Sequence, residues 1–276
     1  MNPFSALAEF VGTNIQNRKQ SMSMAYSALK KQYGGALFGW AWSVVKPTVF
    51  IVVWWFGISI GIRGNKPVEL ADGRLVPFII WMIPGVIAWF FFQDSLSQGV
   101  SCVRKESHLV NKMVFPVATI PVFSVMSYWV THMVMVTLSL IIFICTGNGP
   151  TIYIVQLLFY IPMFFLFCCT VTTFVSTVAV ISRDFEQMIK AILNVFFWLT
   201  PVLWQINKLH SKIGIIIMKV NPFYFFVQGY RESFLGGTWF FEHYRYTLYV
   251  IAFMLVFACF TAGLQKKLAP DFADVL

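Results

Sequence analysis

The chain has 276 residues, of which 58% are hydrophobic and 11% are charged. A soluble domain has about 45 to 50% apolar and about 25% charged residues, so this chain has too few polar side chains to cover a soluble core. Together with a mean hydropathy of +0.73, the composition excludes a water-soluble globule and predicts an all-α polytopic membrane protein.

The formal net charge is +9, and the basic residues stand mainly between or beside apolar segments. Anionic lipid headgroups are therefore the expected partner, and no nucleic acid is expected. The five cysteines lie mostly within apolar runs and show no metal-ligand spacing. We interpret them as core residues and expect no metal site.

Residues 1 to 40 are predicted to form a cytoplasmic, interfacial region. Apolar and aromatic side chains recur there at helical spacing in two series, which are Phe4, Leu7, Val11 and Ile15, then Met22, Tyr26, Leu29 and Tyr33. Amphipathic helices that lie in the headgroup plane have this pattern. The alternative is a soluble helix that folds on a partner.

Six apolar runs reach the length of roughly 20 residues that a membrane-spanning helix needs. They lie at about 41–62, 75–98, 115–146, 151–181, 190–207 and 246–265. The turn signal TGNGP at 146–150 separates the third from the fourth. The sequence therefore predicts six transmembrane helices.

The segment 208–235 precedes the last span and is predicted to be a re-entrant pair of short helices. Its apolar part is interrupted by Lys219 and by Asn221-Pro222, which forbids a continuous helix. Irregular backbone at membrane depth is tolerated only where it is buried in protein or lines a cavity. We therefore expect this segment to pack against the other helices.

The distribution of Lys and Arg sets the expected orientation. With a cytoplasmic N-terminus and six spans, the C-terminal tail 266–276 is also cytoplasmic. The basic residues then inside are Arg18, Lys19, Lys30, Lys31, Arg104, Lys105, Lys112, Arg183, Lys190, Lys266 and Lys267. The external loops carry fewer Lys and Arg residues for their length. The positive-inside rule therefore favours an orientation with both termini in the cytoplasm.

No pattern for catalysis is visible in the sequence. The chain has no GxxxxGK[ST] phosphate loop, no HExxH and no GxSxG. His132 is the main titratable group within a span, and we interpret it as hydrogen-bonded packing rather than a proton relay. We expect this chain to be no enzyme by itself and to hold no cofactor.

Six motifs in register resemble the permease subunits of type-2 ATP-binding-cassette exporters for bacterial surface polysaccharides. They are KKQYGGALFGWAWSVVKP at 30–47, GVIAWFFFQDSLSQG at 85–99, KMVFP at 112–116, ISRDFEQMIK at 181–190, LTPVLW at 199–204 and NPFYFFVQGYRESFLGG at 221–237. The WFFFQD stretch and the tail QKKLAPDFADVL are most similar to the wall teichoic acid exporter, with O-antigen and capsule permeases as near relatives. Lys46 before Pro47 and the run Gly34-Gly35-Ala36 depart from the family pattern.

The resemblance implies an ABC-2 type transmembrane domain over residues 41–265 and an assembly with other subunits. It implies a second copy of the permease, two cytoplasmic ATPase subunits that bind ATP and Mg²⁺, surrounding membrane lipids, and a polysaccharide substrate on a polyprenyl pyrophosphate. The charged segment at about 101–112 would be a coupling helix that docks into the ATPase. Its candidate residues, with two more at the end of the fourth span, are Arg104, Lys105, Glu106, His108, Lys112, Arg183 and Asp184. The alternative for the five residues within 101–112 is a positive-inside anchor that binds no partner. The alternative for Arg183 and Asp184 is a local ion pair between them.

The same resemblance implies a path for the substrate. Lys30, Lys31 and Tyr33 would form a gate for the pyrophosphate, and Asn221, Arg231 and Glu232 would shape the external exit. Aromatic faces on which sugars slide would come from Trp40, Trp42, Trp89, Phe90, Phe91 and Phe92. Packing or an interfacial belt is the alternative for each aromatic residue.

Two other functions remain open from the residues alone. An ATP-driven exporter of small amphiphiles or lipids would have the same coupling helix. A membrane-embedded transferase for polyprenyl lipids would need acidic and basic residues that meet at the bilayer surface.

Overall fold

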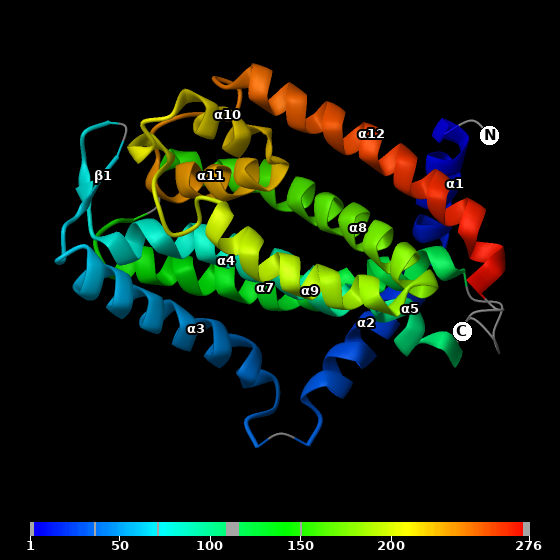
Figure 1. Ribbon diagram of the computed structural model, residues 1–276. Coiled ribbons are helices and arrows are strands. Elements are labelled where there is room, and N and C mark those ends of the chain that lie inside the picture. Colours follow the sequence, from blue (N-terminus) through cyan, green and yellow to red (C-terminus); the bar gives the residue numbers. More distant parts are fainter. Residues whose placement is uncertain (1–2, 36, 71, 109–115, 150, 273–276) are drawn as a thin grey trace.

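The structure is a computed structural model that describes residues 3–35, 37–70, 72–108, 116–149 and 151–272. Within these residues, six long helices run in roughly one direction between the two ends of a bundle (Figure 1). They are α3 (Trp42–Trp55), α4 (Phe78–Gly99), α7 (Ile120–Cys145), α8 (Leu157–Ile181), α9 (Arg183–Leu199) and α12 (Tyr244–Leu268). One end carries the short helix α5 (Cys102–Lys105), and we call it the α5 end. The other carries strands β1 (Val68–Glu69) and β2 (Leu75–Val76), and we call it the hairpin end.

Five helices of the described chain are long and apolar enough to cross a membrane. Their bounds are Gly39–Ile62, Phe78–Gly99, Val117–Cys145, Ile152–Ile181 and Tyr244–Asp271. Four of them include terminal turns outside the α-helical part, namely η1 (Gly39–Ala41), η2 (Phe56–Ile62), η3 (Val117–Thr119), η4 (Ile152–Gln156) and η6 (Ala269–Asp271). They match five of the six predicted runs and confirm an all-helical polytopic fold.

The bounds predicted for the remaining span, 190–207, are wrong. α9 begins at Arg183 and ends at Leu199 after 17 residues. Thr200, which follows, has extended backbone with φ −80° and ψ 138°, because Pro201 disfavours helical geometry in the residue before it. The first turn of α9 is acidic, with Asp184 and Glu186, so the helix starts among charged residues that an apolar search leaves out.

α4 is the centre of the bundle because it is apolar on all sides. Buried residues make up 78% of its most apolar stretch, against 17% in Gly39–Ile62. α4 packs against α3, α7, α8, α9 and α11 (Pro222–Leu235). The outer helices keep an exposed apolar face, as expected where helices meet lipid.

The two N-terminal helices fold onto the bundle of their own chain. α1 (Pro3–Gln16) packs along α12, and α2 (Arg18–Tyr33) packs along α7. The Lys266 ammonium on α12 lies 2.5 Å from the Glu9 carboxylate on α1. Val11 and Ile15 remain exposed, so the apolar stripe of α1 faces away from the bundle. That this stripe lies on a membrane stays a prediction.

The segment 208–235 divides into two unlike helices at the predicted break. η5 (Ile206–Lys208) leads to α10 (Lys212–Val220), and α11 begins at Pro222. α11 is mostly buried, and Gly229 lets it lie close to α8, since a Cβ there would come within 2.2 Å of the Tyr160 ring. α10 instead leaves most of its surface exposed. α11 therefore packs against other helices over most of its surface, whereas α10 contacts α11 and is held to α12 by one hydrogen bond.

A short antiparallel hairpin at the hairpin end is the one β-sheet among the described residues. Val68 pairs with Val76, and both side chains are buried. In its turn, the backbone N–H and the guanidinium of Arg74 donate to Asp72 and hold the pKa of that carboxyl below its usual range. These contacts fix the connection between α3 and α4.

Candidate functional site

An ion pair at the α5 end joins two segments that are far apart in sequence. Arg104 Nη2 on α5 lies 2.5 Å from Glu186 Oε2 on α9, 82 residues away. The side chains are only 19% and 18% exposed, so the contact is shielded from water. Lys190, one turn further along α9, binds Oε1 of the same carboxylate at 2.7 Å. This contact fixes α5 against the start of α9.

The remaining coupling candidates surround this ion pair. Lys105 is exposed, and its ammonium donates to Gln98 at 3.1 Å. Glu106 lies 3.6 Å from His108, which makes an ion pair only when the histidine is protonated. Lys112 lies outside the described residues. Within 101–112 the described helical residues are those of α5 together with Ser107 and His108.

Arg183 and Asp184 stand exposed at the first turn of α9. The ion pairs found in the described chain do not include one between these two neighbours. The local pair that is one interpretation of their sequence is therefore not formed. Their charges face outward beside the Arg104–Glu186 contact.

The candidate gate residues lie at the same end of the bundle. Lys30 and Lys31 are exposed in the last turn of α2, and the side chain of Tyr33 lies outside the described part of the chain. Lys31 lines a cavity of about 460 Å³ together with Lys105 and Glu106. The fold thus brings the predicted pyrophosphate gate beside the predicted coupling segment.

The aromatic candidates divide between core and surface. Trp89, Phe91 and Phe92 are at most 5% exposed. Trp89 and Phe92 pack on Phe223 of α11, while Phe91 stacks on His132 of α7. Phe91 and Phe92 therefore pack inside the protomer, while Trp89, which is buried as well, also lines a cavity with Phe90.

Phe90, by contrast, reaches the surface and stacks on Trp54 with 5.8 Å between ring centroids. The two line a cavity of about 260 Å³ between α3, α4 and α9, which we call the aromatic groove; its other residues are Phe50, Trp89, Gln93, Asn194, Phe197 and Trp198. Trp40 and Trp42 lie apart from this groove, at the turn between α2 and α3. Sequence reasoning missed Phe50, Trp54 and Trp198, although their helical spacing on α3 and α9 was a usable signal.

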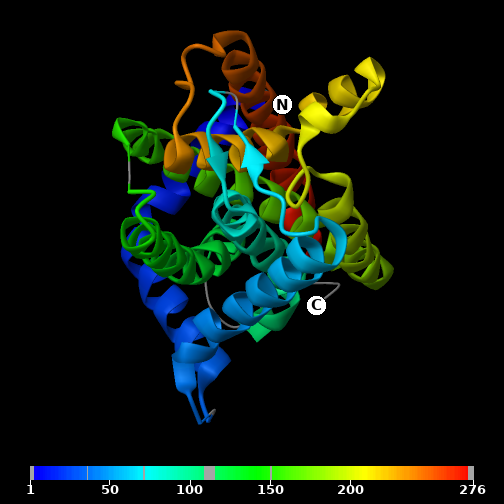
Figure 2. The ribbon, with the colours of Figure 1, turned by 90° about the vertical axis from the view of Figure 1, so that its left-hand side faces the viewer.

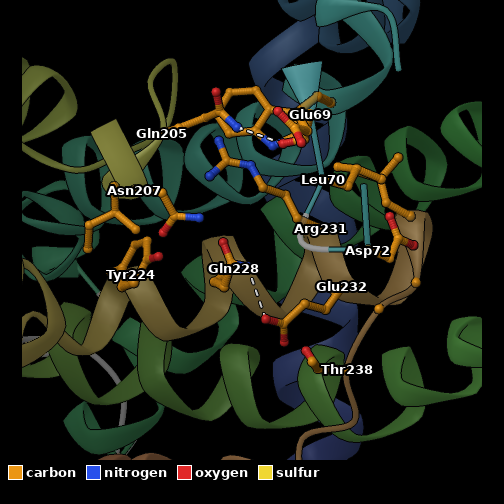
Figure 3. Close-up of a pocket in the computed structure, with 15 residues that line it drawn as sticks. Glu69, Leu70, Asp72, Gln205, Asn207, Tyr224, Gln228, Arg231, Glu232 and Thr238 are labelled. Carbon is orange, nitrogen blue, oxygen red and sulfur yellow. Dashed lines mark hydrogen bonds between the residues drawn. The ribbon is translucent and has the colours of Figure 1, made fainter. Parts of the chain in front are cut away.

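A polar cavity of about 120 Å³ opens at the hairpin end (Figure 3). Its walls come from the hairpin with Glu69 and Asp72, from the loop after α9 with Gln205 and Asn207, and from α11. Trp81 of α4 and the loop after α11 complete the lining. Gln205 donates to the Glu69 carbonyl at 3.2 Å and so holds the loop to the hairpin.

Arg231 and Glu232, two of the three exit candidates, line this cavity. Arg231 is only 3% exposed. Its guanidinium donates to the carbonyls of Pro201, at 2.8 Å, and Val202. Burial raises the pKa of Glu232 above its usual range, and a hydrogen bond from Gln228 partly opposes that rise.

Asn221, the third exit candidate, acts at the start of α11. Its side chain accepts from Phe223 N at 3.0 Å and donates to Thr200 Oγ1 at 3.1 Å. It therefore caps α11 and ties it to the end of α9, and it does not line the cavity.

The family of the chain follows from sequence comparison. Residues 19–235 match the ABC-2 type transporter family. The chain belongs to that family. It is also similar to permeases named O-antigen export system permease protein RfbA. The identity is 23% with that of Myxococcus xanthus, over 79% of this chain and 81% of the relative, and 24% with one from Klebsiella pneumoniae, over 90% and 91%.

Membership settles the broad role of the molecule. An ABC-2 permease is the non-catalytic transmembrane component of its transporter, and this chain is a multi-pass protein of a bacterial membrane. Permeases of this kind pair with ATPase subunits, which bind the ATP. The permease is related to polysaccharide export permeases.

Proposed function

We propose that this permease belongs to an ATP-driven exporter that moves a polyprenyl-pyrophosphate-linked teichoic acid, or a related surface polysaccharide, across the bacterial plasma membrane. The family match and the O-antigen names of the relatives support this substrate class. Two permeases and two ATPase subunits form the transporter. ATP and Mg²⁺ bind to the ATPase subunits.

The α5 end is cytoplasmic in this proposal, and α9 crosses the membrane as the fifth of six spans. α9 runs from the α5 end to the hairpin end beside α4 (Figure 1). Its 17 residues are at the lower limit of about 17 for a spanning helix. An even number of spans returns Lys266 and Lys267 to the side of Arg104 and Lys105, as the positive-inside rule favours.

The observation that carries the proposal is the ion pair between Arg104 and Glu186. It makes α5 and the start of α9 one rigid surface, from which Lys105, His108, Arg183 and Asp184 face outward. A partner that pushes on this surface moves α4 and α9 together, and these helices form two walls of the aromatic groove. Charges that leave the lipid and face water suit a soluble ATPase as that partner.

The substrate path in the proposal connects the two ends of the bundle. Lys31 and Lys105 face one cavity and supply cations for the pyrophosphate. The sugar chain passes along the aromatic groove, which a second copy of the permease completes. Glu232 and its cavity lie at the exit.

The test is a reversal of two exposed charges, Lys105→Glu with Arg183→Glu. Arg104 stays unchanged because its reversal would place like charges against Glu186 inside the permease. Like charges against a partner cost several kcal/mol, so we expect the ATPase retained on affinity-tagged permease to fall at least about tenfold, with export of polymer lost.

The matched control reverses Lys66 and Arg245, which are exposed at the hairpin end, and should retain the ATPase. Full retention and normal export in the Lys105/Arg183 variant would contradict the coupling role.

A further inference from the structure

α10 presents an apolar face that the rest of the chain leaves uncovered. Ile213, Ile216, Ile217 and Val220 are 71%, 61%, 56% and 55% exposed. They recur at positions i, i+3, i+4 and i+7 of the helix, which places them on one side. Four adjacent aliphatic side chains in water would be an unfavourable surface.

The helix divides into three faces around its axis. At about 100° per residue, the four apolar side chains fall within one continuous stripe. Lys212 and Lys219 lie along one border of the stripe and are exposed. Met218, which is 9% exposed, lies on the side of the helix away from the stripe and faces the protein. An interfacial helix has this order, with apolar side chains next to acyl chains and cations next to headgroups.

The position of α10 suits the same environment. In Figure 2 the helix stands away from the bundle at the hairpin end. It is held at its C-terminal end, where Tyr249 of α12 donates to the Val220 carbonyl at 2.8 Å. The stripe is therefore presented beside the ends of the spans and not over their centres.

The charge of the segment also points to an anionic partner. Between Glu186 and Glu232 the sequence has no Asp or Glu, while it has Lys208, Lys212 and Lys219. Three lysines in an external segment run against the positive-inside rule. An anionic partner on that side of the membrane would explain them. A second copy of the chain would bring the same lysines and no acidic residue of this segment to meet them.

We propose that α10 lies in the headgroup layer of the outer leaflet. Its stripe is buried among acyl chains, and Lys212 and Lys219 contact the phosphates of anionic phospholipids. The choice of leaflet rests on the proposed function, whereas the contact with lipid does not. α10 then anchors the start of α11, and with it the exit, to the membrane surface.

The test measures the depth of a spin label at Ile216→Cys, in a chain where Cys145→Ser removes the exposed native cysteine. The assembled permease is placed in vesicles of phosphatidylglycerol and phosphatidylcholine in equal amounts, or of phosphatidylcholine alone. Oxygen is enriched among the acyl chains, so frequent collisions of the spin label with oxygen show that the label lies in lipid. Frequent collisions with a water-soluble nickel chelate show that it lies in water. Both leaflets have the same lipids, so a wrong orientation would not change the result.

We expect the label to meet oxygen rather than the chelate in the anionic vesicles. The reversal Lys212→Glu with Lys219→Glu should raise its exposure to the chelate at least about threefold, because each cation near an anionic surface contributes to attraction. Reversal of Lys66 and Arg245 should leave the depth unchanged. If the Lys212→Glu, Lys219→Glu variant does not fold, the chain with both lysines intact is compared in the two lipid compositions. We then expect the label to lie less deep in vesicles of phosphatidylcholine alone.

Two results would overturn the proposal. One is a label that meets the chelate freely in both lipids, which would place the stripe in water. The other is dipolar broadening between labels of two copies, which would assign the stripe to a permease interface.

Discussion

Arg231 serves the packing of the hairpin end, although its position in the sequence suggests a lining for the exit. Its guanidinium holds the turn at Pro201 and Val202 and lies 3.7 Å from the centre of the Trp81 ring. The close packing over Gly85, where a Cβ would meet the guanidinium at 2.8 Å, leaves no room for a larger residue there. One side chain thus joins α11, α4 and the end of α9.

The substitution Arg231→Met removes these hydrogen bonds and keeps much of the side-chain volume. We expect it to lower the free energy of unfolding by roughly 3 kcal/mol, since two carbonyls lose a charged donor in a buried site. The midpoint of thermal unfolding in detergent measures the effect. Arg245→Met, at an exposed position on the same side, is the control; equal midpoints for the two variants would refute the structural role.

The sequence predicted the roles of some single residues but not the residues that they contact. His132 was predicted to be hydrogen-bonded packing, and this is confirmed by a 2.7 Å contact with the Tyr230 hydroxyl. Its partner is 98 residues away, and no local pattern identifies it. The Arg104–Glu186 ion pair escaped prediction for the same reason, because pairing across the bundle depends on how helices pack.

At the scale of the element, the approach of α11 to α8 depends on Gly229. The substitution Gly229→Ala places a methyl group within 2.2 Å of the Tyr160 ring. We expect a loss of about 1–3 kcal/mol from overpacking, seen as a lower unfolding midpoint, together with weaker export.

Gly263→Ala on α12 is the matched control, because nothing lies within 4 Å of a Cβ there. An alanine in that helix should be neutral or stabilising by up to about 1 kcal/mol. If Gly229→Ala behaved like the control, the close approach of α11 would not be needed for folding.

Hydropathy predicted the elements that are apolar along their whole length and failed where polarity changes along the helix. α4, α7, α8 and α12 follow runs visible in the sequence. α9 begins with charges, and Thr200 and Pro201 end it early. α10 and α11 come from one segment that is apolar on both sides of its break at Asn221-Pro222. Only α11 is mostly buried, and this difference depends on tertiary packing.

At the scale of the whole molecule, orientation and the number of crossings are tested together by labelling single cysteines in the Cys145→Ser chain. An impermeant thiol reagent added to cells should reach Lys66→Cys and Asn207→Cys. Gln187→Cys and Lys267→Cys should react only after the membrane is opened. Each position is exposed in the fold.

The pair Gln187 and Asn207 isolates α9, because Gln187 lies in the second turn of this helix, near its start, and Asn207 lies beyond its end. Labelling of both from the same side would show that α9 does not cross, and reversal of all four positions would invert the proposed orientation.

The contact between Lys266 and Glu9 brings the first and last helices of the chain together at one end of the bundle (Figure 1). A flexible connector from the region of Phe272 in one copy to that of Pro3 in the next would therefore stay on one side of the bilayer. Two permeases fused in this way would form a single polypeptide in which one half can be altered while the other stays intact. A substitution in one half of this fused protein would show how much each permease contributes to one cycle of transport.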